Sequence, residues 1–416
     1  MTQSALQPTP PFLIEAARSR SGDDPIFALN AEAQRRSKAG EAVINATLGA
    51  LMDDQGRLAV MKCVFDAFAQ VDAQRAAGYA PIAGERGFLD AVVTDLFGAS
   101  ELAKNSIAVA TPGGTGALHH AIVNFLEPGQ ALLAPEYYWG PYKTLAEHTR
   151  RKVETFRMFD SARRFDSAAF ERALDGQLTA QGRALVVLNT PCNNPTGYSL
   201  DGAEWSEVTR IVRAAARRAP VALLVDHAYA KFGGPRSEVW VEHAAQLVGE
   251  ALLLVAWTAS KSFTQYGARV GALVAVHSDP AERKRLDNAL AFSCRGTWSN
   301  CNHAGQLAIG RVLADPALRA RADAERDALR KLLDERVTAF NSAAHAAKLD
   351  YPRYEGGFFV SVFAPRAEAA AAHMREAGVF VVPIPGALRV ALCSTPARDV
   401  PRLVQALAAA LSATSN

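Results

Sequence analysis

The stretch Ser260-Lys261-Ser262-Phe263-Thr264-Gln265-Tyr266-Gly267-Ala268-Arg269-Val270-Gly271 lies between two apolar, strand-like runs, Ala251–Trp257 and Val270–Val276. A lysine at the end of a buried strand is costly unless its amine is neutralised or used. A Schiff base between Lys261 and an aldehyde cofactor would use it, and Arg269, eight residues later, would then bind the phosphate of that cofactor. This interpretation requires a phosphate cradle, a carboxylate for a pyridine nitrogen, donors for a phenolic oxygen, and an arginine for the substrate carboxylate.

A glycine-rich turn is the candidate for the phosphate cradle. It is Thr111-Pro112-Gly113-Gly114-Thr115-Gly116-Ala117, which follows one predicted strand and precedes a predicted helix. Glycines such as Gly114 let the backbone approach a phosphate, the helix N-terminus presents free N–H groups, and Thr115 adds a hydroxyl. Turns of this kind also occur for packing reasons alone, so the motif is weak by itself.

Polar residues also end two other predicted strands. Asp226 follows the run Val221–Val225, where a carboxylate could cap a helix, bind a metal, or pair with a protonated pyridine nitrogen. Tyr229 and Asn194 are candidate donors to the phenolic oxygen of the cofactor ring. The segment Asn189–Gly197 around Asn194 would otherwise be an ordinary Pro/Asn/Gly turn.

Two further side chains complete the candidate site. Trp139 stands in an aromatic segment, Pro135–Tyr142, and would stack on the cofactor or simply fill the core. Arg389 interrupts the apolar run Ala387–Leu392. It is either an edge or interface residue or a forked ligand for a substrate α-carboxylate.

Composition indicates a soluble globular protein. The chain has 416 residues, 49% hydrophobic and 21% charged, with a net charge of +3, so we expect two domains and neither a nucleic-acid nor a membrane partner. Its apolar runs are too short to span a membrane, and residues 1–11 show no secretory signal. The five scattered cysteines predict reduced thiols and a cytoplasmic location. We expect no metal, because the adjacent His119 and His120 point to different faces of a helix.

Seven short apolar runs, mostly separated by helical segments, predict an α/β fold with a doubly wound, mostly parallel seven-stranded sheet. The expected strands are Ile107–Ala110, Ala131–Ala134, Val153–Phe156, Ala184–Asn189, Val221–Asp226, Leu252–Trp257 and Val270–Val276. Helices are expected at Gly116–Phe125 and Trp205–Arg218. The ligand would bind at the carboxyl ends of the strands.

After Pro316 the pattern changes to that of a smaller α+β domain. It predicts helices at Leu318–Phe340, Arg366–Ala377 and Val400–Leu411, and strands at Phe358–Phe363, Val379–Val382 and Arg389–Leu392. We therefore expect a large cofactor-binding domain at 57–316. The small domain and an N-terminal arm would comprise 1–56 together with 317–416.

In its ordered set of motifs the chain resembles the class I aminotransferases of pyridoxal-phosphate fold type I, and within them the aspartate/aromatic branch. The resemblance extends nearly end to end. It rests on Asp24–Leu29, Asn45–Ala50, Asp53–Gly56, Tyr79–Gly84, Gly113–Leu118, Asn194–Gly197, Asp226–Tyr229, Ser260-Lys261, Arg269–Ala272, Trp298–Asn300 and Arg389-Val390. Each motif alone is modest, whereas their joint order is highly specific.

The resemblance implies pyridoxal 5'-phosphate as cofactor and a ping-pong transfer of an amino group between an L-amino acid and a 2-oxo acid. Lys261 would hold the internal aldimine and shuttle the Cα proton. Asp226 would pair with the pyridine nitrogen, and Tyr229 and Asn194 with the phenolic oxygen. The remaining roles would be phosphate binding by Gly114, Thr115, Thr258 and Arg269, ring stacking by Trp139, and α-carboxylate binding by Arg389 with Gly49 and Asn194.

A homodimer with shared active sites is also implied, in which Tyr79 of the neighbouring subunit reaches the phosphate. Arg295 matches the branch's distal-carboxylate arginine, which favours aspartate and glutamate without excluding phenylalanine or tyrosine. The chain departs from the branch at Cys294, Gly296, Trp298, Cys301-Asn302 and Tyr142, the last standing where a histidine usually supports the ring-binding aspartate.

Two choices stay open from the sequence. Two extra residues near Glu136–Trp139 leave Tyr137, Tyr138 and Trp139 as alternatives for the stacking ring. A β-lyase, such as a C–S lyase, or a decarboxylase on the same fold is the alternative activity, because either would keep Lys261 and Arg389.

Overall fold

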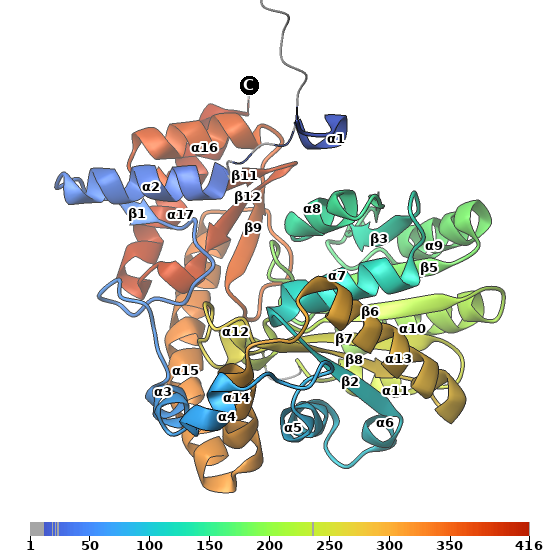
Figure 1. Ribbon diagram of the computed structural model, residues 1–416. Helices are drawn as coiled ribbons and strands as arrows, with labels where there is room; N and C mark the ends of the chain where they lie inside the picture. Colours follow the sequence, from blue (N-terminus) through green and yellow to red (C-terminus); the bar gives the residue numbers. More distant parts are fainter. Residues whose placement is uncertain (1–11, 19, 21, 23–24, 235–236, 416) are drawn as a thin grey trace, which may run out of the picture.

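A seven-stranded sheet forms the centre of the computed structural model, which describes residues 12–18, 20, 22, 25–234 and 237–415 (Figure 1). The strand order is β2-β8-β7-β6-β5-β3-β4. Strands β3 to β7 are parallel, whereas β8 is antiparallel to both of its neighbours, β7 and β2. The strands are β2 Ser106–Thr111, β3 Ala131–Pro135, β4 Lys152–Phe156, β5 Ala184–Asn189, β6 Val221–Asp226, β7 Leu252–Thr258 and β8 Gly271–Val276. The predicted mostly parallel, seven-stranded sheet is confirmed.

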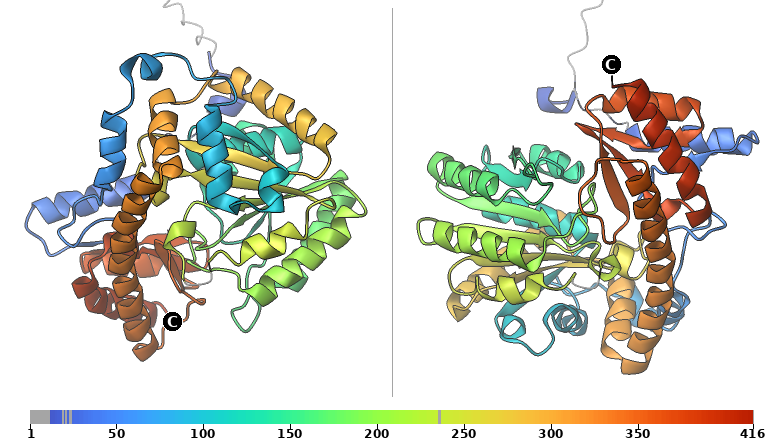
Figure 2. Two further views of the ribbon diagram at one scale, coloured as in Figure 1. Left: turned by 90° about the horizontal axis from the view of Figure 1, so that it is seen from below. Right: turned by 180° about the vertical axis from the view of Figure 1, so that it is seen from behind.

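Helices cover both faces of this sheet, as the views from below and behind show (Figure 2). Successive side chains of a strand point to opposite faces, so on β6 Leu224 belongs to one core and Leu223 and Val225 to the other. Helices on the Leu224 face are α7 Gly113–Phe125, α8 Pro141–His148 and α13 Pro280–Thr297. Helices on the opposite face are α5 Arg86–Phe97, α9 Ser167–Gln181, α10 Gly202–Ala216 and α11 Trp240–Ala245. Because both faces are buried, the central strands β5 to β8 are nearly continuous apolar runs, whereas the edge strand β4 is partly exposed.

Six further elements complete the region around the sheet. They are α3 Lys62–Ala69, α4 Ala73–Ala77, α6 Glu101–Lys104, the 3-10 turn η1 Ala230–Phe232, α12 Ala259–Ser262 and α14 His303–Ala314.

A second hydrophobic core is built from both ends of the described chain. It is organised by a three-stranded antiparallel sheet, β11-β12-β9, and a parallel pair, β1-β10. These strands are β1 Ile44–Asn45, β9 Phe359–Phe363, β10 Val379–Phe380, β11 Val382–Ile384 and β12 Ala387–Ala391. The helices of this region are α2 Pro25–Lys38, α15 Pro316–Ala346, α16 Ala367–Glu376 and α17 Val400–Ala413, with 3-10 turns η2 Leu392–Ser394 and η3 Ala397–Asp399. The short helix α1 Glu15–Arg18 precedes them and buries no residue.

Helix α15 joins the two cores. Ala322 near its start packs in the large core, and Leu333 and Phe340 further along pack in the small one. The pairing of β1 with β10 likewise brings residues near position 45 beside residues near 380. The domain limits at 56/57 and 316/317 stay a prediction.

Most element limits differ from the sequence prediction by a few residues, and two differences change the interpretation. The single strand predicted at Val379–Val382 is divided, because Val379 and Phe380 pair with β1 whereas Val382 begins the strand that pairs with β12. Helix α7 begins at Gly113 instead of Gly116, so the glycine-rich turn is itself the first turn of the helix.

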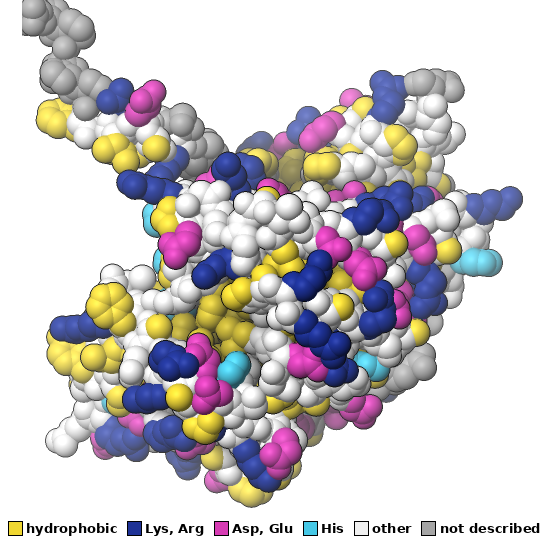
Figure 3. All heavy atoms as spheres, turned by 90° about the vertical axis from the view of Figure 1, so that its right-hand side faces the viewer, with side chains coloured by type: hydrophobic (Ala, Val, Ile, Leu, Met, Phe, Trp, Pro, Cys, Tyr) yellow, Lys and Arg dark blue, Asp and Glu magenta, His cyan; other side chains and the backbone are white. Residues whose placement is uncertain are grey.

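The surface charges and the state of the cysteines can be compared with the composition. Acidic and basic side chains are intermixed on the face drawn in Figure 3. All five cysteines are buried and free. Within the described ranges, no helix combines the length and apolarity needed to cross a membrane, and no three potential metal ligands cluster. The prediction about a secretory signal in residues 1–11 falls outside those ranges.

His120 on α7 predicts how stability changes with pH. It is fully buried, its Nε2 lies 3.3 Å from Cys294 Sγ, and its ring stacks on Trp298. Burial, helped by the neighbouring His119, lowers the pKa of His120 from 6.5 to about 3. Between these values the unfolded chain binds the proton and the folded chain does not, so this contribution to stability is complete above pH 6.5 and is lost as pH falls.

We therefore expect the free energy of unfolding to fall by about 1.4 kcal/mol per pH unit from this residue as the pH is lowered below 6. Urea unfolding at several pH values measures the dependence. The variant His120→Gln should show a shallower dependence than the wild type, and equal slopes would contradict the assignment.

Candidate active site

The carboxyl ends of β5, β6 and β7 and the start of α7 meet at one cavity of about 210 Å³. This is the edge of a parallel sheet at which ligands are expected. The cavity contains nine of the residues predicted from the sequence: Gly114, Thr115, Trp139, Asn194, Asp226, Tyr229, Thr258, Lys261 and Arg269. Segments far apart in the chain therefore contribute to one site.

Arg269 closes the phosphate cradle. Its guanidinium donates to the backbone oxygens of Tyr266 (2.8 Å) and Pro112 (3.3 Å), and it forms no ion pair with a carboxylate of the described residues. A Cβ on Gly113, whose φ is +70°, would lie 2.5 Å from Arg269 Nη2, so only glycine permits this approach. A cation without an acidic partner beside the N-terminus of α7 and the Thr115 and Thr258 side chains fits a phosphate.

Asp226 lies at the buried end of β6, where its exposed fraction is 5%. Its Oδ2 accepts a hydrogen bond of 2.6 Å from the Tyr142 hydroxyl. Asn189, at the end of the neighbouring strand β5, donates to its backbone oxygen at 2.9 Å. Burial raises the pKa of Asp226, against the opposing effects of the Tyr142 hydrogen bond and the Lys261 charge. A buried carboxylate of this kind suits the protonated nitrogen of a pyridine ring.

Lys261 lies in the short helix α12 directly after β7. Its Nζ is 5.1 Å from the centre of the Tyr229 ring. Burial lowers the pKa of the amine, which the Asp226 charge partly offsets and the Arg269 charge reinforces. An amine with a lowered pKa is neutral at a lower pH than a free lysine, as a nucleophile or a base requires.

Tyr229 and Asn194 line the same cavity as Arg269, although the three residues come from different segments of the chain. Asn194 Nδ2 lies 3.3 Å from the Tyr229 hydroxyl oxygen. The backbone N–H of Asn194 donates to Asn189 Oδ1 at 2.6 Å, which holds the turn after β5 against the end of β6. The polar turn thus contributes side chains to the cavity and is more than a chain reversal.

The three adjacent aromatic side chains in the turn after β3 lie in different surroundings. Trp139 lines the cavity. Tyr137 packs against Phe159 and Phe363, away from the residues of the cavity lining, and Tyr138 stacks on Tyr142. This arrangement supports Trp139 as the stacking ring.

Arg389 approaches the site from the small-domain sheet. It is buried on β12, donates to Thr47 O at 2.6 Å, and lies 4.6 Å from the centre of the Phe359 ring. The same ring packs against Tyr229 of the cavity, at 5.9 Å between ring centres. Gly49 is on this side too, since a Cβ there would meet Phe359 Cζ at 2.5 Å. Arg389 and Gly49 therefore both lie beside Phe359, next to Tyr229, and neither is among the residues that line the cavity.

Tyr79 and Arg295 are the predicted residues that do not join the cavity of this chain. Tyr79 is 92% exposed. Arg295 is exposed in the last turn of α13 and donates to Ser299 Oγ at 2.6 Å. Both positions were expected to act across a subunit interface, so a site formed by one chain does not include them.

Sequence reasoning missed four residues of the cavity lining: Leu118, Asn189, Ala228 and Ser260. Ser260 is the most informative, because its hydroxyl lies 2.9 Å from Thr258 Oγ1 and 3.4 Å from Arg269 Nη1. Two hydroxyl residues, at 258 and 260, beside a lysine at a strand end were the available signal for a phosphate ligand.

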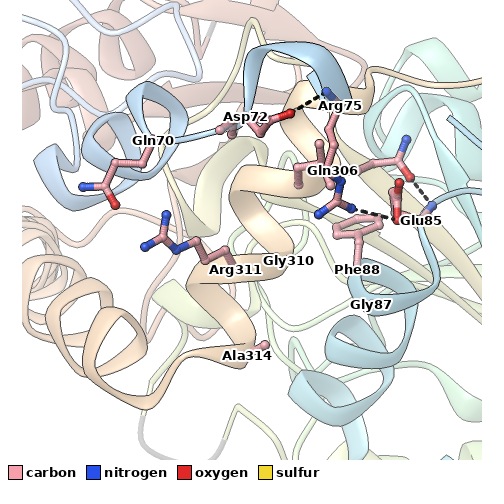
Figure 4. Close-up of a pocket in the computed structure, with 12 residues that line it drawn as sticks. Gln70, Asp72, Arg75, Glu85, Gly87, Phe88, Gln306, Gly310, Arg311 and Ala314 are labelled. Atoms are coloured by element: carbon pink, nitrogen blue, oxygen red, sulfur yellow. Dashed lines mark hydrogen bonds and ion pairs between the residues drawn. The ribbon is translucent and has the colours of Figure 1, made fainter. Parts of the chain in front are cut away.

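A larger cavity, of about 430 Å³, lies between α4, α5 and α14 and contains none of the predicted residues (Figure 4). Three of its polar side chains, those of Arg75, Glu85 and Gln306, are engaged in contacts within the cavity lining. Gln306 Oε1 accepts from the Glu85 backbone N–H at 2.8 Å, and Arg75 pairs with Glu85 at 3.6 Å. Size alone therefore does not locate the active site.

A lysine, a buried aspartate and a phosphate cradle at the carboxyl edge of this α/β sheet define a pyridoxal-phosphate enzyme. The chain belongs to the aminotransferase family of class I and II, whose family model matches residues 41–407. It is a pyridoxal-phosphate-dependent transaminase.

Two similar proteins are named as aminotransferases. A tyrosine aminotransferase of Klebsiella pneumoniae is 31% identical over 81% of this chain and 85% of its own. An aspartate aminotransferase of Pseudomonas aeruginosa is 32% identical over 79% and 82%. Each of these relatives is named an aminotransferase, which favours transamination over the lyase and decarboxylase alternatives.

Solved structures show the same fold. An aminotransferase from Anaerococcus prevotii superposes with a TM-score of 0.92 at 34% identity, covering 96% of this chain and 99% of that one. An aromatic-amino-acid aminotransferase from Burkholderia pseudomallei, described as covalently bound to pyridoxal phosphate, gives a TM-score of 0.80 at 26% identity, covering 95% and 98%. The aspartate-aminotransferase-like fold class and the cofactor are thus confirmed.

Proposed function

We propose that this transaminase acts on dicarboxylic or aromatic L-amino acids, or both, and the corresponding 2-oxo acids. The observation that carries the proposal is the position of Arg389, a buried arginine that packs on the same Phe359 ring as Tyr229 of the cavity. Both tyrosine and aspartate aminotransferases are among its relatives, which supports these two substrate classes.

Pyridoxal phosphate, when bound, supplies an electron sink that acidifies the Cα–H of an attached amino acid. Gly114, Thr115, Thr258, Ser260 and Arg269 would hold the phosphate. Asp226 would keep the pyridine nitrogen protonated, Asn194 and Tyr229 would hold the phenolic oxygen, and Trp139 would cover the ring.

Lys261 and Arg389 would act on the substrate. Arg389 would bind the α-carboxylate through two parallel N–H donors and thereby orient the Cα–H bond, helped by Asn194 and Gly49. Burial lowers the pKa of the Lys261 amine. This amine would take the proton from Cα of the substrate and return it to C4′ of the cofactor.

We further infer a homodimer in the cytoplasm. Exposed apolar side chains support an interface: Leu58, Val60, Phe65, Tyr79, Ile82 and Phe292. Phe292 stands one helical turn before Arg295, the residue expected to reach the partner's substrate. Five reduced, buried thiols support an intracellular location. Sedimentation velocity tests the dimer.

A half-reaction scan tests the function. Cofactor-loaded protein is mixed with single L-amino acids in the absence of any 2-oxo acid, and the cofactor absorbance is followed. Conversion to the aminated cofactor by aspartate, glutamate, phenylalanine or tyrosine is the expected result. Ammonia and pyruvate released without a 2-oxo acid would indicate the lyase instead.

Arg295→Ala separates the two substrate classes. A distal carboxylate loses its charged partner in this variant, whereas an aromatic side chain does not, so kcat/KM should fall by about tenfold or more for aspartate and little for phenylalanine. Arg285→Ala, an exposed arginine elsewhere on α13, is the control and should leave both values unchanged. Equal losses for both substrates would make Arg295 a structural residue.

A further inference from the structure

The loop between α4 and α5, residues 78–85, is held at both of its ends by one histidine, His303, the first residue of α14. Its Nδ1 lies 2.8 Å from Gly78 O, directly before Tyr79, and its Nε2 lies 2.5 Å from Glu85 Oε1. The His303 side chain is 10% exposed, whereas Tyr79 between the two contacts is 92% exposed. One side chain therefore fixes both ends of a loop that presents Tyr79 at the surface.

The two partners of the His303 ring can only accept hydrogen bonds. A backbone carbonyl carries no proton, and neither does an ionised carboxylate. A neutral imidazole has a single N–H group, so it could donate to Gly78 or to Glu85 but not to both. Two donated bonds require the imidazolium form. The geometry therefore holds one more proton than a neutral histidine beside a carboxylate would.

The charged groups around this contact come from three elements. Arg75 on α4 lies 3.6 Å from Glu85 Oε2, a contact typical of a carboxylate (Figure 4). Arg86, the first residue of α5, pairs within its own helix. On α14 itself the next charged residue is Arg311, about two turns later. Within the part of the chain that the structure describes, Glu85 is the only charged group at ion-pair distance from the His303 ring.

Loss of the second proton would release the end of the loop that carries Tyr79. A bond to a charged acceptor is stronger than one to a neutral carbonyl, so a neutral His303 would keep its N–H toward Glu85. Its Nδ1 would then present a lone pair to the oxygen of Gly78, and two acceptors repel each other. The end at Glu85 has further support, because its backbone N–H donates to Gln306 Oε1 at 2.8 Å.

We propose that His303 is a positioning residue, which in its doubly protonated form clamps the loop 78–85 and fixes the direction of Tyr79, and that the clamp opens as the pH rises. The inference rests on the proposed homodimer, in which Tyr79 reaches the cofactor phosphate of the neighbouring subunit. Histidine is the side chain that ordinarily loses a proton between pH 5 and 8. Cofactor binding should therefore weaken with rising pH through this residue.

The variant Glu85→Gln tests the proton count directly. The glutamine amide can donate to a neutral His303 Nε2 while the Nδ1–H still donates to Gly78 O, so both contacts survive without the second proton. The Kd of pyridoxal phosphate is measured for the apo forms of the wild type and the variant at pH 6 and pH 9. We expect the ratio of wild-type to variant Kd to rise about fivefold between the two pH values. Groups that titrate in both proteins, such as Asp226 and Lys261, cancel in this ratio.

His303→Leu supplies a second measure, because it removes both contacts. At pH 6 it should bind the cofactor about fivefold more weakly than the wild type, and the ratio of its Kd to that of Glu85→Gln should be the same at both pH values. His345→Leu replaces an exposed histidine in the last turn of α15 and should behave as the wild type. Melting temperatures verify that each variant is folded.

A Tyr79→Phe background shows whether the effect passes through Tyr79. There the pH-dependent change in the ratio should fall below about twofold. A ratio that is the same at pH 6 and pH 9, or a change that persists in full without the Tyr79 hydroxyl, would overturn the proposal. A wild type that sediments as a monomer would contradict the proposed homodimer instead. Hydrogen exchange of the amides of residues 79–85 then decides on the clamp, since their protection relative to Glu85→Gln should fall between pH 6 and pH 9, and constant relative protection would refute it.

Discussion

Replacing Lys261 with alanine is expected to lower transaminase turnover by about a thousandfold or more. In the proposed function the amine would be both the covalent attachment for the cofactor and the base at Cα. Burial lowers the pKa of the Lys261 amine, and the Asp226 charge opposes this effect. The variant should also lose the visible absorbance of covalently attached cofactor, although the phosphate cradle would remain. Absorbance spectra and turnover with a saturating amino acid and 2-oxo acid measure both effects.

Lys284→Ala is the matched control for this prediction. Lys284 is an exposed lysine on α13 that pairs with Asp287 at 3.3 Å. Its replacement should change neither turnover nor the absorbance of the attached cofactor. Normal turnover in Lys261→Ala would refute the whole assignment of the site, since no other lysine lines the cavity within the described chain.

The second large effect is expected from Arg389→Lys. Lysine keeps the charge but cannot present two parallel donors, so kcat/KM for every amino acid substrate should fall by about tenfold to a hundredfold. The loss should be of similar size for aspartate and phenylalanine, because all amino acids share the α-carboxylate. Steady-state kinetics with both substrates measures it.

Arg163→Lys controls for the packing of a guanidinium on an aromatic ring. The Arg163 guanidinium lies 4.1 Å from the centre of the Phe363 ring, and Phe363 is on β9, the strand that also holds Phe359. Arg163 itself is on the surface, where it pairs with Asp350. It should leave kcat/KM unchanged. If Arg389→Lys affected only one class of substrate, Arg389 would be recognising a side chain and the α-carboxylate would need another ligand.

Local patterns in the chain were sufficient to predict the central sheet. Strands buried on both faces are continuous apolar runs, and two of them, Ala184–Asn189 and Val221–Asp226, have the predicted limits. The strand ends also identified Asp226, Lys261 and the cradle, because a polar group at the end of a buried strand is costly unless it has a use. These features depend on residues close together in the sequence.

Other features depend on contacts between distant segments. The sequence predicted Trp139 as the stacking ring but left Tyr137 and Tyr138 as alternatives, and only the path of the turn after β3 placed Trp139 in the cavity. The division of β10 from β11 followed from pairing with β1, more than 330 residues away. The hydrogen bond from Tyr142 to Asp226 spans 84 residues, and only the resemblance to the family pointed to this position, whereas the structure shows that a tyrosine makes the contact. The sequence alone determined which chemical groups the protein has and the strands that carry them, since burial and backbone preference act locally. The tertiary structure decided which of those groups meet, because the distances between side chains depend on how the whole chain packs.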